Sequence, residues 1–332
     1  MRQVESLLDD PEVLSFVAAP PAVLERIGRA ELERIAISNQ SHPLRQLRDT
    51  VRIAGFARRL GARCLHVHGL VRAPTGALAA AIARIPWTLT AHNLVPPDPR
   101  LPERAVLART LPRAARCIAV SEAVARSLRG WIPDERIRVV RNGIDPAPFD
   151  AAPSKEDARR VLGWHSDQRI VLAVARLSPE KGLDRLAWLA RQPGIRVVVA
   201  GDGPERSRLL AAGIELLGTR TDIPLLLAAA DCVAVPSVSE GLGLAAVEAL
   251  AAGRPVVATA VGGLPEVVDT EVGELVPEAA DAERFGRTVL EVIDRPDRWE
   301  ALGRRGKQRV QSRFDIHSMR AATRECWREA IG

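Results

Sequence analysis

One segment constrains the fold of this chain more than any other: PSVSEGLGLAAVEALAAGRPVVATAVGG, residues 236–263. An apolar strand is expected to end at Pro236, a turn with two glycines follows, and a helix begins at about Leu244. Gly241 and Gly243 allow the backbone to approach a ligand closely and to adopt positive φ. Free amides at the start of the helix suit a phosphate. The segment therefore predicts a strand–turn–helix unit with an anion-binding turn.

Short apolar runs alternate with Ala/Leu/Arg-rich helical stretches along the whole chain, which predicts repeated strand–helix units and parallel sheets. In the first half we expect strands near 13–19, 34–38, 64–68, 87–91, 117–120 and 137–141. In the second half we expect strands at 170–175, 195–200, 232–236 and 255–258, and helices at 182–191, 204–212, 223–230 and 244–252. The fold class predicted is α/β, with two Rossmann-like doubly wound domains.

The domains are placed at 1–150 and 151–332. Residues 145–160, which contain three prolines and mixed charges, are the expected linker. Two doubly wound domains joined in this way predict a ligand cleft between them, at the carboxyl ends of the strands. The last helix, about 315–332, is expected to pack back on the N-terminal domain.

The composition is that of a globular protein, with 47% hydrophobic and 27% charged residues. No stretch approaches the roughly 18 apolar residues that span a bilayer, and the acidic N-terminus lacks the apolar core of a secretory signal. The four cysteines have no metal or redox spacing and are expected to be small buried side chains in a reducing compartment: Cys64, Cys117, Cys232 and Cys326. These features predict a cytoplasmic protein.

Residues 1–150 contain 22 Arg, no Lys and 15 acidic residues, whereas residues 151–332 are nearly neutral. The positive charge favours an anionic membrane face or an anionic acceptor, although an Arg-rich composition from a GC-rich genome explains it as well. Nucleic acid is not expected as a partner, because the chain has no Tyr and only 3% aromatic residues on which bases could stack.

A basic stripe lies within residues 101–117, where three arginines and three apolar residues recur on opposite sides at helical spacing: Arg109, Arg113 and Arg116, and Leu107, Leu111 and Ala114. Such a stripe is typical of a helix that rests on the inner face of a membrane as a peripheral contact. It is equally typical of a helix that covers a sheet, and Pro112 interrupts it. We favour the second interpretation.

Two further strings carry charged groups at strand ends. In VLAVARLSPEKGLDRL, Arg176 and Lys181 suit a pyrophosphate, although a solvated loop has the same pattern. Glu240 and Glu248 can each accept two hydroxyl hydrogen bonds, as from a ribose or a hexose, and each alone is compatible with a surface glutamate. Gly203, in VVVAGDGPER, follows another strand, where any tight turn would need a glycine.

Together these strings resemble the retaining glycosyltransferases of family 4, also called group 1, which have the GT-B fold. The resemblance includes the glutamates eight residues apart, SPEKG, AGDGPE, LLLAAAD before CVAVPS, GGLPEVV and GELVP. In the first half it includes LHVHG, LTAHN, IAVSEAVA and VRNGID, in the family's order. The resemblance extends from about Ala62 to the C-terminus.

The resemblance implies roles for matching residues. Arg176 and Lys181 would bind the donor diphosphate and stabilise its charge as it leaves. Glu248 would accept the ribose hydroxyls, Glu240 would lie beside the donor sugar, and His92 would approach that sugar. The remaining donor-binding residues would act through their backbone: Gly203, Gly241, Leu242, Gly243 and Leu244. No metal and no other cofactor is implied, because cationic side chains and helix amides bind the diphosphate.

His66 and His68 share one face of a predicted strand, so both could reach the cleft or both could be buried. They lack the partners of a metal site, and we interpret them as structural. The sequence departs from the family at its start, because we find no opening strand with a Gly-rich loop before VESLLDD. We therefore expect an N-terminal domain without its first strand. Ala175 also stands where the family commonly has Gly.

The resemblance implies transfer of a sugar from a UDP- or GDP-linked donor to an unidentified acceptor hydroxyl, in polysaccharide, glycolipid or glycoside biosynthesis. The anomeric configuration would be retained without an enzymic nucleophile. A first alternative is a non-catalytic or partner-dependent protein that binds a nucleotide sugar, suggested by the missing strand. A nucleotide-sugar epimerase shares the architecture but would not ordinarily combine SPEKG with SEGLGLAAVE.

Overall fold

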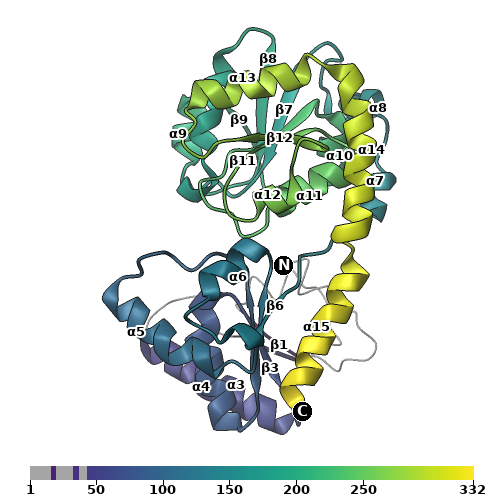
Figure 1. Ribbon diagram of the computed structural model, residues 1–332. Helices are drawn as coiled ribbons and strands as arrows, with labels where there is room; N and C mark the ends of the chain where they lie inside the picture. The colour runs from purple at the N-terminus through teal and green to yellow at the C-terminus, as the bar shows by residue number, and fades with distance from the viewer. Residues whose placement is uncertain (1–15, 20–32, 37–42) are drawn as a thin grey trace. The chain divides into compact units, whose positions relative to one another are not determined.

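The computed structural model describes residues 16–19, 33–36 and 43–332, which form two compact units (Figure 1). Unit 1 comprises Met1–Gly143 and Ile316–Gly332, and unit 2 comprises Ile144–Asp315. Each unit contains a sheet of parallel strands, so the predicted class of two parallel α/β domains is confirmed. The chain passes from unit 1 to unit 2 between Gly143 and Ile144, shortly before the domain boundary that the sequence predicted at residue 150.

The main sheet of unit 1 has four parallel strands in sequence order: β3 (Leu65–His68), β4 (Trp87–Ala91), β5 (Arg116–Ala119) and β6 (Ile137–Val139). A separate parallel pair is formed by β1 (Phe16–Ala19) and β2 (Glu33–Ala36). The helices and 3-10 turns of the described part are α3 (Pro43–Arg59), η1 (Leu70–Arg72), α4 (Ala73–Ala83), α5 (Leu101–Thr110), η2 (Leu111–Arg113), α6 (Glu122–Leu128), η3 (Asp134–Arg136) and α15 (Ile316–Ile331). The expected absence of a first strand concerns residues 1–15, which lie outside the described residues.

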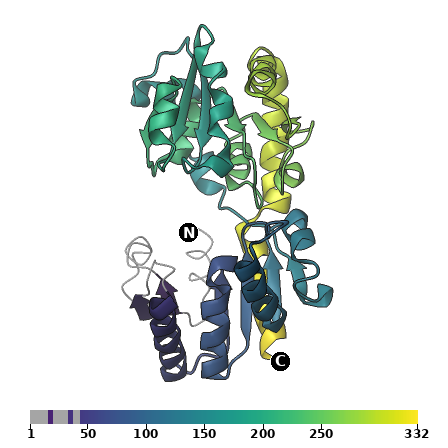
Figure 2. The ribbon, with the colours of Figure 1, turned by 90° about the vertical axis from the view of Figure 1, so that its left-hand side faces the viewer.

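Different helices cover the two faces of this sheet, as Figures 1 and 2 show for α3 and α15. In the strand register Thr90 pairs with His68 on one side and with Ile118 on the other, so these three side chains share a face. Ile118 packs against Met319 of α15, whereas Leu65, of the opposite face, packs against α3 and α4. The histidines of β3 therefore lie on the face that α15 covers.

The sheet of unit 2 has six parallel strands in the order β12-β11-β10-β7-β8-β9. Their bounds are β7 (Arg169–Val174), β8 (Ile195–Ala200), β9 (Glu215–Gly218), β10 (Cys232–Val235), β11 (Val256–Thr259) and β12 (Gly273–Val276). The helices and 3-10 turns are α7 (Ala147–Asp150), α8 (Lys155–Leu162), η4 (Pro179–Lys181), η5 (Leu183–Leu186), η6 (Leu189–Arg191), α9 (Arg206–Ala211), α10 (Ile223–Ala229), α11 (Leu244–Ala251), α12 (Leu264–Val267), α13 (Ala282–Ile293) and α14 (Pro296–Arg313). Central strands such as RIVLAV are almost wholly apolar, because helices cover both faces of a parallel sheet.

Residues 182–191 form the short 3-10 turns η5 and η6, so the prediction of a continuous helix there is wrong. Leu183, Leu186 and Leu189 are all buried at a spacing of three residues. That spacing matches the three-residue turn of a 3-10 helix, which places every third side chain on one side. The core therefore favours 3-10 geometry in this segment.

The expected linker, residues 145–160, is largely helical and belongs to unit 2. The Ser154 hydroxyl accepts a hydrogen bond from the Asp157 amide at 3.2 Å and caps α8, so a residue taken as a loop signal begins a helix. Phe149 and Ala158 are buried. Pro146 and Pro148 stand at the start of α7, where no backbone donor is lost.

The C-terminal helix α15 is part of unit 1, where Arg116 of β5 donates to Glu329 at 2.5 Å. Three of the four cysteines are buried, Cys64 is half-buried, and all four are free thiols. Within the described ranges, no helix is both long enough and apolar enough to cross a membrane. The same part of the chain has no cluster of His, Cys, Asp and Glu that could hold a metal ion.

A buried ion pair stabilises the packing of α8 against the sheet of unit 2. Asp231 accepts a hydrogen bond from Arg159 at 2.7 Å and another from the Ile170 amide at 2.7 Å, and it also contacts Lys155. The Arg159 side chain is only 4% exposed. Removing Asp231 would leave this guanidinium buried without its carboxylate, which is far more costly than losing an exposed pair.

We therefore expect Asp231→Ala to lower the free energy of unfolding by about 3–5 kcal/mol in urea titrations. The control is Glu300→Ala, because Glu300 is 85% exposed and lies 3.9 Å from Arg304. The control should change stability by less than about 1 kcal/mol. Equal losses in the two variants would contradict a structural role for the buried pair.

Candidate functional site

The loops at the centre of the unit 2 sheet form the candidate site. Strand order reverses at β7, since β8 and β9 lie on one side of it and β10, β11 and β12 on the other. In open parallel sheets the loops that leave the two strands at such a switch point diverge, and ligands bind at the carboxyl ends there. The loop after β7 contains the SPEKG string, and the loop after β10 contains SVSEGLG.

Lys181 and Glu240 come from these two loops and meet. The Lys181 Nζ lies 2.7 Å from Glu240 Oε2, and the Ser237 hydroxyl donates to the same oxygen at 3.1 Å. Both charged side chains are largely buried, with 25% of Lys181 and 15% of Glu240 exposed. The structure therefore brings together a cation and a carboxylate that are 59 residues apart in the chain.

Backbone contacts hold the two loops in this arrangement. The Glu180 carbonyl accepts a hydrogen bond from the Val238 amide at 2.9 Å. Arg185 donates to the carbonyls of Pro236 at 3.1 Å and Ser237 at 3.4 Å. Neither Arg185 nor Ser237 was predicted as a site residue from the sequence. The sequence did contain a signal for Ser237, because this residue lies within the glycine-bearing turn. It contained none for Arg185, because Arg185 contacts a loop that is distant in sequence.

Glycine positions shape the backbone beside Glu240. At Gly262, with a φ of 53°, a Cβ would lie 1.8 Å from the Glu240 carbonyl oxygen, so only glycine fits. Gly243 precedes α11 with a φ of 97°, and no side chain caps that helix. The turn predicted from Gly241 and Gly243 is thus present, and it leads into the start of α11, where helices favour anions.

Arg176 is not brought to the Lys181–Glu240 pair. Its exposed guanidinium contacts Glu180, four residues along the chain. Desolvation opposes ionisation of Glu180, but its own backbone amide and the Arg176 guanidinium outweigh it and lower the pKa of this carboxyl to about 2. Glu180 is therefore a carboxylate at neutral pH and competes with any anion for Arg176.

The other predicted donor residues occupy loops and one helix turn. Gly203 follows β8, where a Cβ would lie 2.4 Å from the Leu177 carbonyl oxygen, so this glycine allows two loops to pack closely. Leu242 is 2% exposed, which leaves only its backbone for a ligand. Leu244 begins α11, and Glu248 lies in the second turn of that helix with 9% of its surface exposed.

In unit 1, His92 directly follows β4 and belongs to a cluster of three histidines. Its Nε2 lies 3.0 Å from Nδ1 of His68, and the two rings are nearly parallel. His66 lies beside His68, with ring centroids 4.6 Å apart. The interpretation of His66 and His68 as structural did not include this contact with His92. The register of β3 against β4 creates this contact, and no local sequence pattern reports it.

Polar side chains surround His66 on the α15 face of the sheet. Its Nδ1 lies 2.6 Å from the Thr88 hydroxyl and 3.0 Å from the indole nitrogen of Trp327 in α15, and its Nε2 lies 2.9 Å from the Thr90 hydroxyl. Desolvation lowers the pKa of His66 to about 3 and that of His92 to about 4, and it lowers the pKa of His68 well below its usual range. All three rings are neutral at pH 7.

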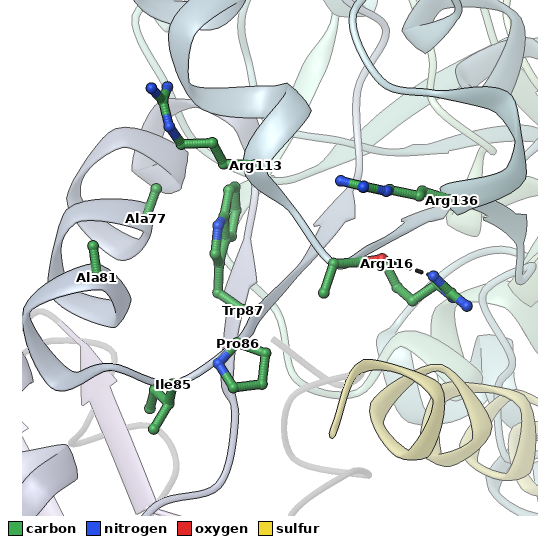
Figure 3. Close-up of a pocket in the computed structure, with 9 residues that line it drawn as sticks. Ala77, Ala81, Ile85, Pro86, Trp87, Arg113, Arg116 and Arg136 are labelled. Atoms are coloured by element: carbon green, nitrogen blue, oxygen red, sulfur yellow. Dashed lines mark hydrogen bonds between the residues drawn. The ribbon is translucent and has the colours of Figure 1, made fainter. Parts of the chain in front are cut away.

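A cavity of about 520 Å³ in unit 1 lies at the amino ends of the strands, opposite the end at which His68 and His92 lie (Figure 3). It is lined by α4 and by residues at the starts of β4 and β5, including Pro86 and Trp87. Its Arg116 already contacts Glu329, and its Arg136 donates to the Pro112 carbonyl at 3.0 Å. We do not place the site there, because the charged loops and the histidines lie at carboxyl ends of strands.

The basic stripe of residues 101–117 is divided among α5, η2 and β5. Its apolar members Leu107, Leu111 and Ala114 are buried in unit 1, with at most 5% of each exposed. The apolar side of the stripe is therefore packed inside unit 1, in line with the interpretation that we favoured, and is not available to a membrane.

The fold and this geometry define a class of protein with two parallel α/β units and a cation–carboxylate pair at a switch point. Residues 154–309 match the family described as "Glycosyl transferases group 1", and residues 9–148 match "Glycosyltransferase Family 4". Together the two matches span most of the chain. The chain belongs to this family of glycosyltransferases, as the motifs indicated.

Curated relatives are identical to this chain at more than a third of the aligned positions. It is 36% identical to a D-inositol 3-phosphate glycosyltransferase of Mycolicibacterium smegmatis over 262 residues, which cover 70% of this chain and 59% of that enzyme. A protein of the same description from Mycobacterium bovis is 38% identical over 64% of this chain and 50% of its own length. The matched region thus spans only about half to three-fifths of these relatives.

Solved structures of GT-B glycosyltransferases resemble this fold. Anabaena HepE in complex with UDP-glucose is 25% identical, with a TM-score of 0.80, and the likeness covers 92% of this chain and 88% of that one. HepE in complex with UDP and glucose has a TM-score of 0.85 at 23% identity, over 98% and 95% of the two chains. At such identities the likeness supports the fold rather than a particular activity.

The neutral histidines predict a pH dependence of stability. A histidine in the unfolded chain has a pKa near 6.5, well above the folded values of His66, His68 and His92. The unfolded state therefore binds more protons below about pH 6.5, and stability should fall as the pH decreases from there towards 4. The loss is at most about 1.4 kcal/mol per pH unit for each ring.

Urea unfolding at several pH values tests this expectation. His92→Leu should show a shallower loss of stability between pH 6.5 and 4 than the wild type, because one depressed pKa has been removed. The matched control is His165→Leu, since His165 is exposed in unit 2 and should leave the pH dependence unchanged. Identical pH dependence in His92→Leu and the wild type would contradict the neutral buried state.

Proposed function

We propose that this chain is a retaining glycosyltransferase that moves a sugar from a UDP- or GDP-linked donor to an acceptor hydroxyl. The observation that carries the proposal is the 2.7 Å contact of Lys181 with Glu240 at the switch point of unit 2. Lys181 offers positive charge to a diphosphate, and Glu240 offers oxygens to sugar hydroxyls. The start of α11 adds backbone amides that favour a phosphate.

When its ion pair with Glu180 breaks, the Arg176 guanidinium binds the diphosphate as the second cation of the site. That ion pair is exposed, with 68% of the Arg176 side chain and 41% of the Glu180 side chain in contact with solvent. Exposed pairs contribute only about 0–1 kcal/mol, so a diphosphate with two charges can displace the carboxylate. Glu248 accepts the ribose hydroxyls, and the backbone of Gly203 and of residues 241–244 contacts the donor.

Catalysis in this proposal relies on charge stabilisation and positioning. The acceptor hydroxyl attacks the face of the sugar from which the nucleotide departs, and an oxygen of the leaving diphosphate takes the hydroxyl proton. Lys181 and Arg176 stabilise the negative charge that develops on the diphosphate, and His92 contacts a hydroxyl of the donor sugar. This chemistry needs no metal ion and no other cofactor.

The acceptor is proposed to be an anionic polyol, glycolipid or saccharide. The Arg-rich first half of the chain favours an anion. D-inositol 3-phosphate is the first acceptor to test, because the curated relatives are described by it. If the acceptor is carried on a lipid, unit 1 would make a peripheral contact with the membrane surface. If the enzyme acts in the biosynthesis of a polysaccharide or a small glycoside, the acceptor needs no lipid and the enzyme needs no membrane contact.

Donor binding is tested by thermal unfolding with UDP, GDP, ADP and their glucose conjugates. A ligand at 100 times its Kd should add about 2.7 kcal/mol, which raises Tm by several degrees. We expect one base to give this shift, and Lys181→Ala to abolish it. Lys307→Ala is the matched control, because Lys307 lies in α14 of unit 2 and pairs with Asp150 at 2.8 Å. A Lys181→Ala shift equal to that of the wild type would contradict the donor site.

Transfer is tested by release of the nucleotide in the presence of a panel of acceptors. Lys181→Ala and Glu240→Ala should each lower kcat by at least about 100-fold, corresponding to roughly 3 kcal/mol of lost charge stabilisation and positioning. Near-normal turnover in either variant would contradict the assignment. Donor binding without turnover on any acceptor would favour the alternative of a partner-dependent nucleotide-sugar-binding protein.

A further inference from the structure

The contact between His68 and His92 determines which atom of His92 can meet a substrate. Nε2 of His92 lies 3.0 Å from Nδ1 of His68, within hydrogen-bond distance. Each nitrogen of a neutral imidazole acts either as a donor or as an acceptor. Because Nε2 is used by His68, Nδ1 is the ring nitrogen of His92 that is left for another partner.

The same contact couples the protonation of the two rings. A neutral imidazole carries one proton, so a hydrogen bond between two neutral rings needs one nitrogen with a proton and one without. If His68 donates from Nδ1, then His92 must carry its own proton on Nδ1. If His92 donates from Nε2, then His68 must carry its proton on Nε2. In both arrangements the two rings have the same tautomer.

His66, two residues before His68 on the same strand β3, supports this pair. The Trp327 indole can only donate, so Nδ1 of His66 accepts, and the neutral His66 ring carries its proton on Nε2, which donates to the Thr90 hydroxyl. With its tautomer fixed in this way, His66 stands edge-on against His68, at an angle of 73° between the ring planes. Helix α15 thereby helps to orient the ring that holds His92.

We infer that His68 is a positioning residue for His92: it fixes the ring and its tautomer, so that Nδ1 of His92 faces the donor sugar in a defined state. The role of His92 at the sugar rests on the proposed function. The coupling of the two tautomers does not, since it follows from the 3.0 Å contact and the neutrality of the rings.

Nuclear magnetic resonance of the ligand-free protein tests the coupling without any activity. The chain has six histidines, so the ring nitrogens of ¹⁵N-histidine-labelled protein can be assigned by single His→Gln variants. We expect His66 to carry its proton on Nε2, and His68 and His92 to show equal populations of the two tautomers. In His68→Leu the tautomer population of His92 should change. Opposite tautomers in His68 and His92, or an unchanged His92 in the variant, would overturn the inference.

Kinetics test the consequence for transfer. His68→Leu should lower kcat roughly 10- to 100-fold, by analogy with removal of the hydrogen-bond partner that orients a metal-bound histidine. Donor KM should stay within about twofold, because the diphosphate binds in unit 2. His68→Gln should recover part of the lost kcat, since its amide can both donate and accept. His165→Gln is the control for replacing a histidine at an exposed position.

These variants separate this inference from the proposed function. Full kcat in His68→Leu, together with loss of turnover in Glu240→Ala, would overturn the positioning role and leave the transferase proposal intact. Full turnover in Glu240→Ala would contradict the proposed function, and the tautomer measurement would then decide the inference alone. A far-UV circular dichroism spectrum and a cooperative urea transition like those of the wild type would show that the His68→Leu variant is folded.

Discussion

The contact between Lys181 and Glu240 is the interaction on which the unit 2 site depends. Neighbouring parallel strands place their following loops side by side, but at a switch point the loops turn to opposite sides and leave space between them. A cation from one loop and a carboxylate from the other can meet in that space only if both backbones are held. Carbonyl contacts of Arg185 and the close approach of Gly262 to Glu240 provide this support.

The two cations of the expected diphosphate site are in different states. Lys181 is largely buried and already in place, whereas Arg176 is exposed and paired with Glu180. Placing a buried lysine beside a carboxylate avoids an uncompensated charge in the ligand-free protein. Breaking the exposed ion pair of Arg176 with Glu180 costs little free energy, so this arginine can move easily. The proposed diphosphate site would thereby combine a preformed cation and an adaptable one from a single loop.

Sequence patterns predicted the parts of the fold that are encoded locally. The strands β7, β8 and β10 were found because RIVLAV, IRVVVA and CVAV are almost wholly apolar, as is typical of buried parallel strands. Strands β9 and β12 were not predicted, because both lie at sheet edges and their sequences, ELLG and GELV, contain Glu and Gly. The glycine turn and the charged loops were predicted because each motif is contiguous.

Contacts that depend on strand register were not predictable in the same way. His68 and His92 are 24 residues apart, and only the pairing of β3 with β4 shows that they meet. The partner of Arg176 was also missed, although Glu180 lies four residues away. The motif suggested a ligand for Arg176, and an ion pair within the loop satisfies the same charge when no ligand is present.

The chain passes between its units twice, at Gly143–Ile144 and at Asp315–Ile316. On the unit 2 side the two connections are adjacent, because the Ile144 amide donates a hydrogen bond to the Phe314 carbonyl at 2.9 Å. Unit 1 is therefore assembled from two separated stretches of the chain. Trp327, from the second stretch, donates a hydrogen bond to His66 of the histidine cluster. Recombination at a single point near residue 150 would give a chimera whose first unit has a foreign last helix. Viable exchange of units among relatives would require the final 17 residues to travel with the N-terminal segment.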